Sequence, residues 1–454
     1  MARSAPGSRV SQVLPAVADP QRPARVILLA YHFPPTSEVG ALRAQKIAES
    51  FVRRGAHVHV ITVELPGSAS TPDTEGITVH RVRPHLDLRG LYRRFTRRGR
   101  AEPPASGSGA KEETWRPPER NSFIKRHVSA AMWLPDDHQG WVMPAARRAC
   151  ELAVGGCDLL YSTSPPPSVH LAGLLTRWRA RIPWVAEFRD PWTDNPGKPS
   201  FVRSRWSDAA ERFLERRCLS SASGVVTVTE SAAERFRTRL REQSASKVIV
   251  VRNGIDHLDP PFEPCTTVER VIYVGSLYKD RDPRPFLRAV SQLARSGRLS
   301  SAFTVELIGD CRSLLGVSIE AFVQTEGLDG IVRFTDTIPH SEALARLRDA
   351  DLLLLLAQHQ PLQVPNKLYE YLGARRPILA FADAEGETAR MLRDLGGHSV
   401  IDHDDEPLIL SVVEAAIAGK AENPASIRRE SILQDWTSER QLRHLHSELD
   451  RLLI

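Results

Sequence analysis

Long apolar runs are absent from this sequence, and cysteine is scarce for a length of 454 residues. The longest apolar stretches, such as residues 352–357, are far shorter than the roughly 20 residues that span a bilayer. No Cys-x-x-Cys pair or other metal-ligand spacing occurs. We therefore predict no membrane-spanning helix and no cysteine-based metal site, with the cysteines as buried thiols in a reducing compartment. The five cysteines are Cys150, Cys157, Cys218, Cys265 and Cys311.

The first 24 residues lack the apolar core of a signal peptide and are rich in Ala, Pro, Ser and Arg. We predict that residues 1–24 are a disordered tail and that the protein is cytoplasmic. A strong charge of one sign is missing too, because 61 basic residues are balanced by 55 acidic ones and the net charge is +6. A net charge this small for the length argues against a dedicated nucleic-acid-binding protein, because such proteins concentrate basic and aromatic residues on one element.

The chain is too long for one ordinary hydrophobic core and favours two domains of about 200 residues each. Residues 25–30 form a short apolar run, followed by a turn-rich stretch and by apolar residues at helical spacing from Ala44 to Phe51. Residues 57–63 then alternate as in a strand. This order predicts a β-loop-α-β unit of a doubly wound α/β fold, and a second series of strands and helices begins near residue 271.

Residues 364–379 lie between two apolar runs and combine a loop, a short helix and the next strand. A helix entered at the carboxyl edge of a parallel sheet offers free backbone N–H groups and a positive dipole end, which suit a phosphate. Lys367 lies in the first turn, and Glu370 is placed to reach the hydroxyls of a ribose. The same residues also fit an ordinary solvated helix start. Sugar nucleotides, however, present a diphosphate and a ribose together.

The pattern Pro-x-Lys-x-x-Glu-Tyr-Leu-x-Ala-x-x-Pro-Ile at residues 365–378 resembles the nucleotide-sugar site of retaining family-4 glycosyltransferases of the GT-B architecture. The resemblance covers residues 25–425 and implies an α/β chain with two Rossmann-like, doubly wound domains that face each other across a cleft. In that family a second glutamate usually precedes Glu370 by eight positions. Leu362 stands there in this sequence, as in members that open with Pro-x-Lys.

The resemblance places the domain boundaries as well. Residues 25–258 are the predicted acceptor domain and contain a flexible basic insertion at about 85–122. Residues 265–425 are the predicted nucleotide-sugar domain. Residues 426–454 are predicted to form helices that return to the amino-terminal domain, as the last helix of the family often does.

Donor-binding residues are implied for both halves. Gly40 lies in a loop that matches the amino-terminal glycine loop of the family, where a glycine lets the backbone approach the donor phosphates. Arg43, in the first turn of the next helix, is a candidate phosphate contact. In the carboxyl half, the candidates are Asn366, Lys367, Glu370 and Glu387.

One donor loop departs from the family pattern. The family usually supplies an Arg after the first glycine of the carboxyl half and a Lys before a second glycine, and both contact the diphosphate. This sequence has Ser276 and Asp282 at those positions. We expect Lys279 or Arg281, from within the same loop, to take over the contact, although these residues also fit a solvated charged loop.

Charged residues follow the strand predicted at 184–188. Arg189 and Asp190, in Phe-Arg-Asp-Pro-Trp, lie where many family members place a histidine of the catalytic site, and relatives with this sequence resemble enzymes of surface-glycan assembly. Charged groups at the carboxyl end of a strand point into the crevice of this architecture. We therefore predict both as catalytic, with Asp190 as the preferred polar group at the reacting centre. Alternatively, they pair and cap the local backbone.

Residues 133–141 combine two tryptophans, a proline and paired carboxylates. Asp136, Asp137 and His138 are acceptor-side candidates because they are available for contacts to hydroxyl groups. The tryptophans equally fit a small satellite core around a proline turn, and we prefer that interpretation.

Eight arginines lie between Arg81 and Arg100, interleaved with apolar residues at helical spacing. Such a basic amphipathic segment can lie on an anionic membrane, at the inner face of the plasma membrane, or simply form an exposed arginine-rich helix. The two interpretations are equally supported. Residues 101–114 read as a flexible linker.

Together these features predict a hexosyltransferase-type enzyme of polysaccharide biosynthesis that moves a sugar from a nucleotide-sugar donor to a glycan or polyprenyl-linked acceptor with retention of configuration. Helix N-termini and basic side chains neutralise the leaving diphosphate. No Asp-x-Asp follows a predicted strand, so we expect no metal and no cofactor. Two alternatives stay open: a non-catalytic GT-B-fold scaffold in glycan assembly and, less favoured, a sugar-nucleotide epimerase.

Overall fold

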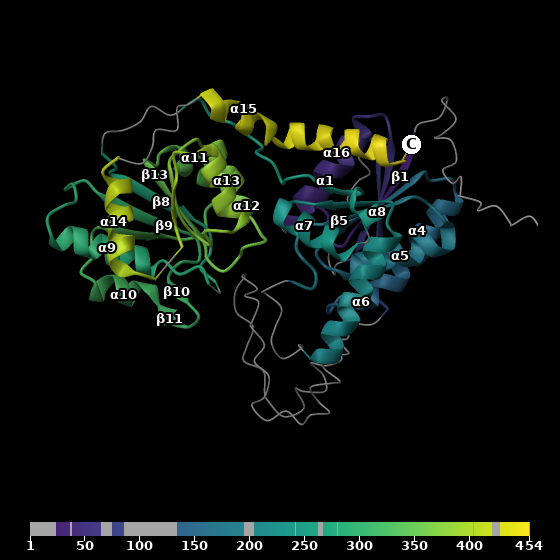
Figure 1. The fold of residues 1–454 in the computed structure, drawn as a ribbon, viewed down its shortest axis with the longest axis horizontal. Helices are drawn as coiled ribbons and strands as arrows, with labels where there is room; N and C mark the ends of the chain where they lie inside the picture. Colours follow the sequence, from purple (N-terminus) through teal and green to yellow (C-terminus); the bar gives the residue numbers. More distant parts are fainter. Residues whose placement is uncertain are drawn as a thin grey trace, which may run out of the picture. The chain divides into compact units, whose positions relative to one another are not determined.

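The described chain forms two compact α/β units, each built around one sheet, in this computed structural model (Figure 1). The first unit takes in the described residues up to 226 together with 237–249 and 446–453, and the second takes in 227–236 and 250–445. The structure describes residues 24–36, 39–64, 75–85, 134–194, 204–240, 242–261, 267–278, 280–402, 404–419 and 427–453. The predicted tail, the basic segment between residues 86 and 100, the linker at 101–114, Lys279 and Cys265 lie outside these ranges.

The first unit has a seven-stranded sheet in the order β3-β2-β1-β4-β5-β6-β7. Neighbouring strands from β3 to β5 run parallel, and the chain order reverses between β1 and β4. At such a reversal the carboxyl ends of two strands diverge, which is where open α/β sheets bind ligands. The strands are β1 Arg25–Ala30, β2 His57–Val63, β3 Ile77–Val82, β4 Leu159–Ser164, β5 Trp184–Phe188, β6 Gly224–Thr227 and β7 Val248–Val250.

Helices connect these strands, and apolar residues at helical spacing face the sheet. In α1, Ala44, Ile47 and Ala48 are fully buried. Near the carboxyl end of the chain, His446 contacts the same helix, with its ring edge-on to Phe51 and Nε2 3.0 Å from Ser50 Oγ. The helices within the first unit are α1 Val39–Val52, η1 Gln139–Trp141, α4 Val142–Val154, α5 Ser168–Ala180, α6 Arg205–Ser221 and α8 Glu242–Ala245. Two further helices, α7 Glu230–Arg239 and α16 Ser438–Leu453, begin in the residues of the second unit and end in those of the first.

The second unit has a six-stranded, wholly parallel sheet in the order β12-β9-β8-β13-β14-β15, which reverses between β8 and β13. The central strand β13 is a continuous apolar run because helices cover both faces of the sheet. Leu352, Leu354 and Leu356 pack on one face, whereas Leu353 and Leu355 pack on the other. The strands are β8 Arg270–Val274, β9 Thr304–Ile308, β12 Val332–Thr335, β13 Leu352–Ala357, β14 Ile378–Ala382 and β15 Ser399–Ile401.

The two faces of this sheet are covered by different helices. Apolar residues of α9, α10 and α14 join the first of these clusters, and those of α11, α12 and α13 join the second. A short hairpin, absent from the sequence prediction, turns at Gly316 with φ +86°. The remaining elements are α9 Arg284–Arg295, β10 Ser313–Leu314, β11 Val317–Ser318, α10 Ile319–Thr325, α11 His340–Arg348, α12 Asn366–Gly373, α13 Glu387–Leu395, α14 Glu406–Ile417 and α15 Ile427–Asp435.

The prediction of two doubly wound, Rossmann-like α/β domains is confirmed by these two sheet orders. The prediction that all cysteines are buried is wrong for Cys150 and Cys157, which are half-buried on α4 and in the turn after it. Neither forms a disulfide bond, and the same holds for the buried Cys218 and Cys311. No helix within the described ranges is long and apolar enough to cross a membrane.

Gly254 belongs to the Asn-Gly-Ile-Asp segment that follows β7, and its φ of +85° favours glycine. A Cβ on this residue would lie 2.5 Å from the Cα of Ser438. Ile255 holds the two segments together, since its N–H donates to Trp436 and its carbonyl accepts from Ser438 at 2.8 and 2.9 Å. Close backbone contact, in addition to the positive φ, therefore requires glycine here.

Replacing Gly254 by alanine should destabilise the protein by about 2–4 kcal/mol, because steric overlap adds to the strain of a positive φ. Gly297→Ala is the matched control, since Gly297 has φ +68° but a Cβ added there would meet no atom within 4 Å. It should cost only about 1 kcal/mol. Urea denaturation of both variants measures the difference, and equal losses would show that the contact with Ser438 is unimportant.

Candidate functional site

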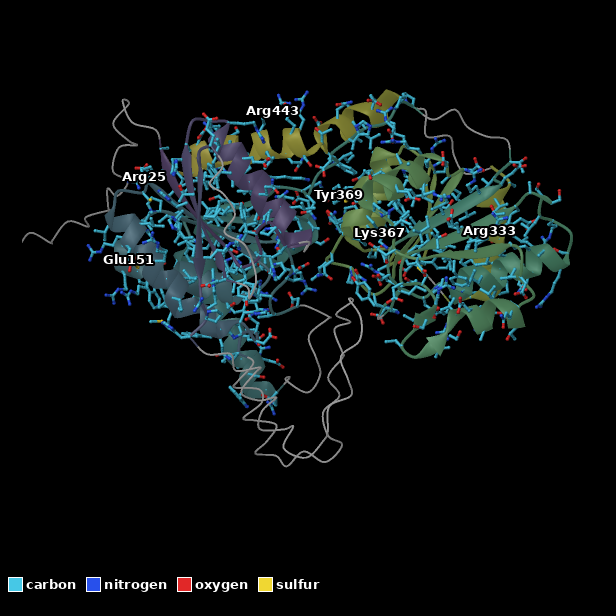
Figure 2. The ribbon with its side chains drawn as sticks, turned by 180° about the vertical axis from the view of Figure 1, so that it is seen from behind. Arg25, Glu151, Arg333, Lys367, Tyr369 and Arg443 are labelled. Carbon is cyan, nitrogen blue, oxygen red and sulfur yellow. The ribbon has the colours of Figure 1, made fainter. Side chains whose placement is uncertain are left out.

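The carboxyl ends of β8 and β9 meet the start of α12 in the second unit. Lys367, which projects from α12 (Figure 2), reaches the turn that follows β8. A Cβ on Gly275 would lie 2.2 Å from Lys367 Nζ, and the φ of Gly275 is +135°. Gly309, after β9, would in turn place a Cβ 2.7 Å from the carbonyl oxygen of Gly275. Gly275 therefore leaves room for the ammonium group, and Gly309 leaves room for the backbone of Gly275.

Tyr273, on β8, is the polar partner of this ammonium group. Lys367 Nζ donates to the Tyr273 hydroxyl at 3.0 Å and lies 4.2 Å from the centre of its ring. The hydroxyl itself donates to the carbonyl of Ser276 at 3.1 Å. Burial raises the pKa of Tyr273, so the phenol stays neutral and keeps its proton for that bond.

Burial, together with the nearby charge of Arg281, lowers the pKa of Lys367 to about 7. Arg281 is itself buried, with its guanidinium 4.2 Å above the ring centre of Tyr278. Its Nε has no hydrogen-bond partner in the described part of the chain. Within the same ranges no carboxylate forms an ion pair with either cation. The buried Arg281 and the half-buried Lys367 thus lie close together, and the charge of Glu370 acts on Lys367 without forming an ion pair with it. Two neighbouring basic groups of this kind suit an anion.

The start of α12 adds backbone donors to these charges. Pro365 precedes the helix, and the first N–H groups of any helix have no partner within it. Tyr371, one turn further on, fixes the helix to the sheet because its hydroxyl accepts from the N–H of Val274 at 2.9 Å. Asn366 is exposed at the first position, and Glu370 is half-buried one turn after it. The predicted roles of both residues stay predictions.

Glu387, at the start of α13, is fully buried in the second unit. Its carboxylate accepts from the Ser231 hydroxyl at 2.9 Å, from the N–H of Glu230 at 3.2 Å and from Arg252 at 3.1 Å. Burial pushes the pKa of Glu387 up, but the hydrogen bond from Ser231 and the charge of Arg252 outweigh it and hold the pKa below its usual range. These bonds hold the start of α7, and the predicted donor contact of Glu387 stays a prediction.

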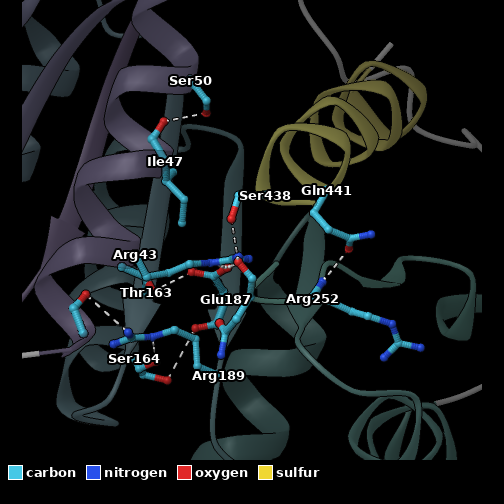
Figure 3. Close-up of polar contacts among 12 residues, drawn as sticks. Arg43, Ile47, Ser50, Thr163, Ser164, Glu187, Arg189, Arg252, Ser438 and Gln441 are labelled. Carbon is cyan, nitrogen blue, oxygen red and sulfur yellow. Dashed lines mark hydrogen bonds and ion pairs between the residues drawn. The ribbon is translucent and has the colours of Figure 1, made fainter. Parts of the chain in front are cut away.

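In the first unit, Arg43 forms a buried ion pair with Glu187 (Figure 3). The guanidinium donates to Glu187 Oε1 at 2.8 and 3.2 Å, while the Thr163 hydroxyl donates to Oε2 at 2.6 Å. Glu187 was not among the predicted residues, although a glutamate inside the apolar strand β5 is a signal for a buried polar contact. Arg43 is thus paired with Glu187, and its predicted contact with a donor phosphate stays a prediction.

Arg189 follows β5 and is held by backbone oxygens. Its Nε donates to the carbonyl of Ser164 at 2.7 Å and its Nη1 donates to that of Gly40 at 3.2 Å (Figure 3). A Cβ on Gly40 would lie 2.8 Å from the guanidinium, which explains a glycine at this position. Burial lowers the pKa of Arg189. Asp190, next in the chain, is half-buried at the same carboxyl edge, and the catalytic role of both residues stays a prediction.

The loop before α4 brings together the three acceptor-side candidates. Asp136 accepts from the N–H of His138 at 2.8 Å and from that of Ser168, the first residue of α5, at 2.7 Å. It thereby caps a helix that begins 32 residues later. Burial raises the pKa of Asp136. The His138 ring lies 4.2 Å from that of Tyr31, and its Nε2 lies 3.3 Å from Asp137.

Metal ligands are not grouped in the described ranges, where no set of three or more His, Cys, Asp or Glu is placed to hold an ion. One expectation from the sequence needs correction. Strand β15, which was not predicted, ends directly before Asp402, so an Asp-x-Asp formed with Asp404 does follow a strand. It lies at the edge of the sheet, away from the strand-order reversal between β8 and β13.

Comparison with known proteins agrees with this geometry. Residues 40–254 match a family model described as a glycosyl transferase 4-like domain. Solved structures that the chain resembles include sucrose-phosphate synthase from Thermosynechococcus elongatus, with 14% identity, coverage of 94% of this chain and 99% of that one, and a TM-score of 0.62. The chain has the GT-B fold.

Other GT-B structures resemble the chain to a similar degree. HepE of Anabaena, solved with UDP and glucose, is 14% identical over 94% of this chain and 100% of its own, with a TM-score of 0.58. TarM of S. aureus, solved as a variant with UDP, fondaparinux and alpha-GlcNAc-glycerol, is 8% identical over 95% of this chain and 99% of its own, with a TM-score of 0.59. No curated protein matches the sequence.

Replacing Arg43 by methionine should destabilise the protein by about 3–5 kcal/mol, because it leaves the Glu187 carboxylate buried without its cation. The double variant Arg43→Met/Glu187→Gln should recover a large part of this loss. Urea denaturation measures both. If Arg43 instead served mainly to bind phosphate, Arg43→Met would leave the free energy of unfolding nearly unchanged and weaken nucleotide binding alone.

Proposed function

We propose that this protein is a retaining glycosyltransferase that takes its sugar from a nucleotide-sugar donor. The observation that carries the proposal is the pair of neighbouring basic groups Lys367, which is half-buried, and Arg281, which is buried. Neither forms an ion pair with a carboxylate of the described ranges, and Lys367 lies in the first turn of α12. A buried charge without a partner costs stability, so its presence calls for a ligand of opposite charge. A diphosphate fits that requirement, and relatives of the same fold were solved with UDP and UDP-glucose.

In this proposal the diphosphate binds at the N-terminus of α12. The ammonium group of Lys367 and the guanidinium of Arg281 neutralise the negative charge that develops on the leaving nucleoside diphosphate. The helix dipole and the first N–H groups of α12 add to this stabilisation. Glu370 lies one turn along the helix from Asn366 and accepts hydrogen bonds from the ribose hydroxyls. The charge of the leaving group is thus met by the chain's own residues, and we propose that no metal is required.

Asp190 is the polar group that we propose at the reacting centre. Arg189 donates to two backbone carbonyls, so it is better suited to position the loop than to move a proton. The proposed acceptor is a glycan or a polyprenyl-linked saccharide, assembled at the inner face of the plasma membrane. Support comes from TarM, a relative solved with glycan ligands, and from the resemblance of the Phe-Arg-Asp-Pro-Trp segment to enzymes of surface-glycan assembly.

A non-catalytic scaffold is the second candidate. Leu362 and Ser276 replace an acidic and a basic residue that the family usually has, and such losses are expected in a protein that no longer turns over a donor. Release of nucleoside diphosphate from UDP-, GDP- or dTDP-sugars separates the two candidates. An enzyme releases it faster when an acceptor is present, whereas a scaffold releases none.

Glu370→Gln should weaken the binding of one nucleoside diphosphate by about 10-fold or more, since it removes the proposed acceptor for ribose hydroxyls. Binding of pyrophosphate, which has no ribose, should be unchanged. Thermal shift with UDP, GDP, dTDP and pyrophosphate measures both effects. Glu385→Gln, at an exposed residue before α13, is the matched control. Equal losses for pyrophosphate and nucleotide would disprove the ribose role.

Binding of the diphosphate should weaken as the pH rises above about 7, by up to about tenfold per pH unit. The pKa of Lys367 is about 7 in the free protein, and a bound anion raises it, so binding takes up a proton in this range. Titration calorimetry in buffers of different ionisation enthalpy, between about pH 7 and 9, measures the uptake. Lys367→Met should bind more weakly and without this pH dependence. A pH-independent affinity in the unmodified protein would contradict the assignment.

A further inference from the structure

Helix α6 exposes an unusual face. Three large aromatic side chains are exposed to solvent: Phe213 of α6 at 62%, Trp206 of α6 at 37%, and Trp178 of the neighbouring α5 at 52%. Trp206 and Phe213 are seven residues apart, so they lie almost above one another along the helix. Isolated exposed apolar residues are common, but three large aromatic side chains on two packed helices form a patch.

Arginines form a second stripe beside the aromatic one. At about 100° per residue, the exposed positions of α6 fall within an arc of about 140°. No carboxylate in the described ranges forms an ion pair with the exposed arginines of this helix. One of them, Arg217, has its guanidinium 5.4 Å from the ring centre of Trp178. The exposed arginines of α6 are Arg205, Arg212, Arg216 and Arg217.

The acidic residues of α6 point the other way. Glu211 and Glu215 are buried, and Asp208 is half-buried. Glu215 forms an ion pair with Arg239 and accepts from the N–H of Thr193 at 3.0 Å. The net charge of the helix therefore understates the charge of its exposed face, which is wholly positive. A helix that hides its carboxylates and presents arginines and aromatics has the surface chemistry of an interfacial helix.

We propose that this face of α6, together with Trp178, docks the protein on an anionic lipid bilayer. Arginines bind lipid phosphates, and tryptophan and phenylalanine insert at the level of the headgroups. A protein partner is less suited, because a stripe of one charge sign flanking convex aromatics offers neither a groove nor mixed polar groups. The proposal rests on the proposed function in one respect, since a polyprenyl-linked acceptor would itself lie in that bilayer.

Vesicle sedimentation tests the proposal without any donor or acceptor. The full-length protein should bind vesicles in which about a third of the lipid is phosphatidylglycerol and bind weakly to phosphatidylcholine alone. Arg212→Glu/Arg216→Glu should lower the partition coefficient on anionic vesicles by at least about tenfold. Trp206→Ser/Phe213→Ser should lower it by a similar factor, because it removes the inserted aromatic rings.

Matched controls distinguish an effect of this face from an effect of net charge or of exposed apolar surface elsewhere. Arg440→Glu/Arg443→Glu makes the same charge change on exposed positions of α16, and Leu315→Ser/Val317→Ser removes exposed apolar groups from the β10–β11 hairpin. Both should bind like the unmodified protein. Thermal shift with nucleotides should be the same in all variants, so loss of vesicle binding with intact nucleotide binding tests this proposal alone.

Three results would overturn it: no binding of the unmodified protein to anionic vesicles, binding that the α6 variants retain in full, or self-association in light scattering that the α6 variants abolish. The last result would identify the face as an interface between copies of the chain. Failure to bind any nucleotide, with vesicle binding unchanged, would instead argue against the proposed function and leave the docking face standing.

Discussion

The packing of the Lys367 ammonium group against Gly275 and Tyr273 is the constraint on which the candidate site depends. The group lies where a Cβ on Gly275 would be, and it donates to a phenol whose own proton is donated to the carbonyl of Ser276. Burial then destabilises its charged form and lowers its pKa to about 7. Local geometry, rather than any single residue type, turns an ordinary lysine into a charge that is best satisfied by an anion.

The two units differ in how the charged side chains at the carboxyl edge of their sheets are paired. In the first unit the carboxyl edge of the sheet is internally neutralised, because Glu187 meets Arg43 and backbone carbonyls meet Arg189. In the second unit the basic groups at the corresponding edge, Lys367 and Arg281, form no ion pair with a carboxylate of the described ranges, and the pKa of Lys367 is lowered to about 7. A charged ligand gains little where opposite charges are already paired and gains more where they are not. This contrast favours the second unit for the diphosphate site that we propose.

Much of the fold was predictable because its signals are local. Alternation of apolar residues, glycines at turns and a proline before Asn366 define strands, loops and helix starts within a few residues. Partners distant in sequence were not predictable. Tyr273 lies 94 residues before Lys367, and Glu187 lies 144 residues after Arg43, so no periodic pattern links them. Gly40 was predicted to let the backbone approach the donor phosphates, which stays a prediction; the side chain beside it in the structure is Arg189.

The bond from the Val274 N–H to the Tyr371 hydroxyl has a consequence for ligand capture. It ties the end of β8 to the middle of α12, so the cations and the helix start keep their spacing without a ligand. A site that is already ordered loses little conformational entropy on binding, and its association rate is set by diffusion and electrostatic attraction rather than by loop rearrangement. If the diphosphate binds there as we propose, selectivity among donors is left to the residues around this ordered site.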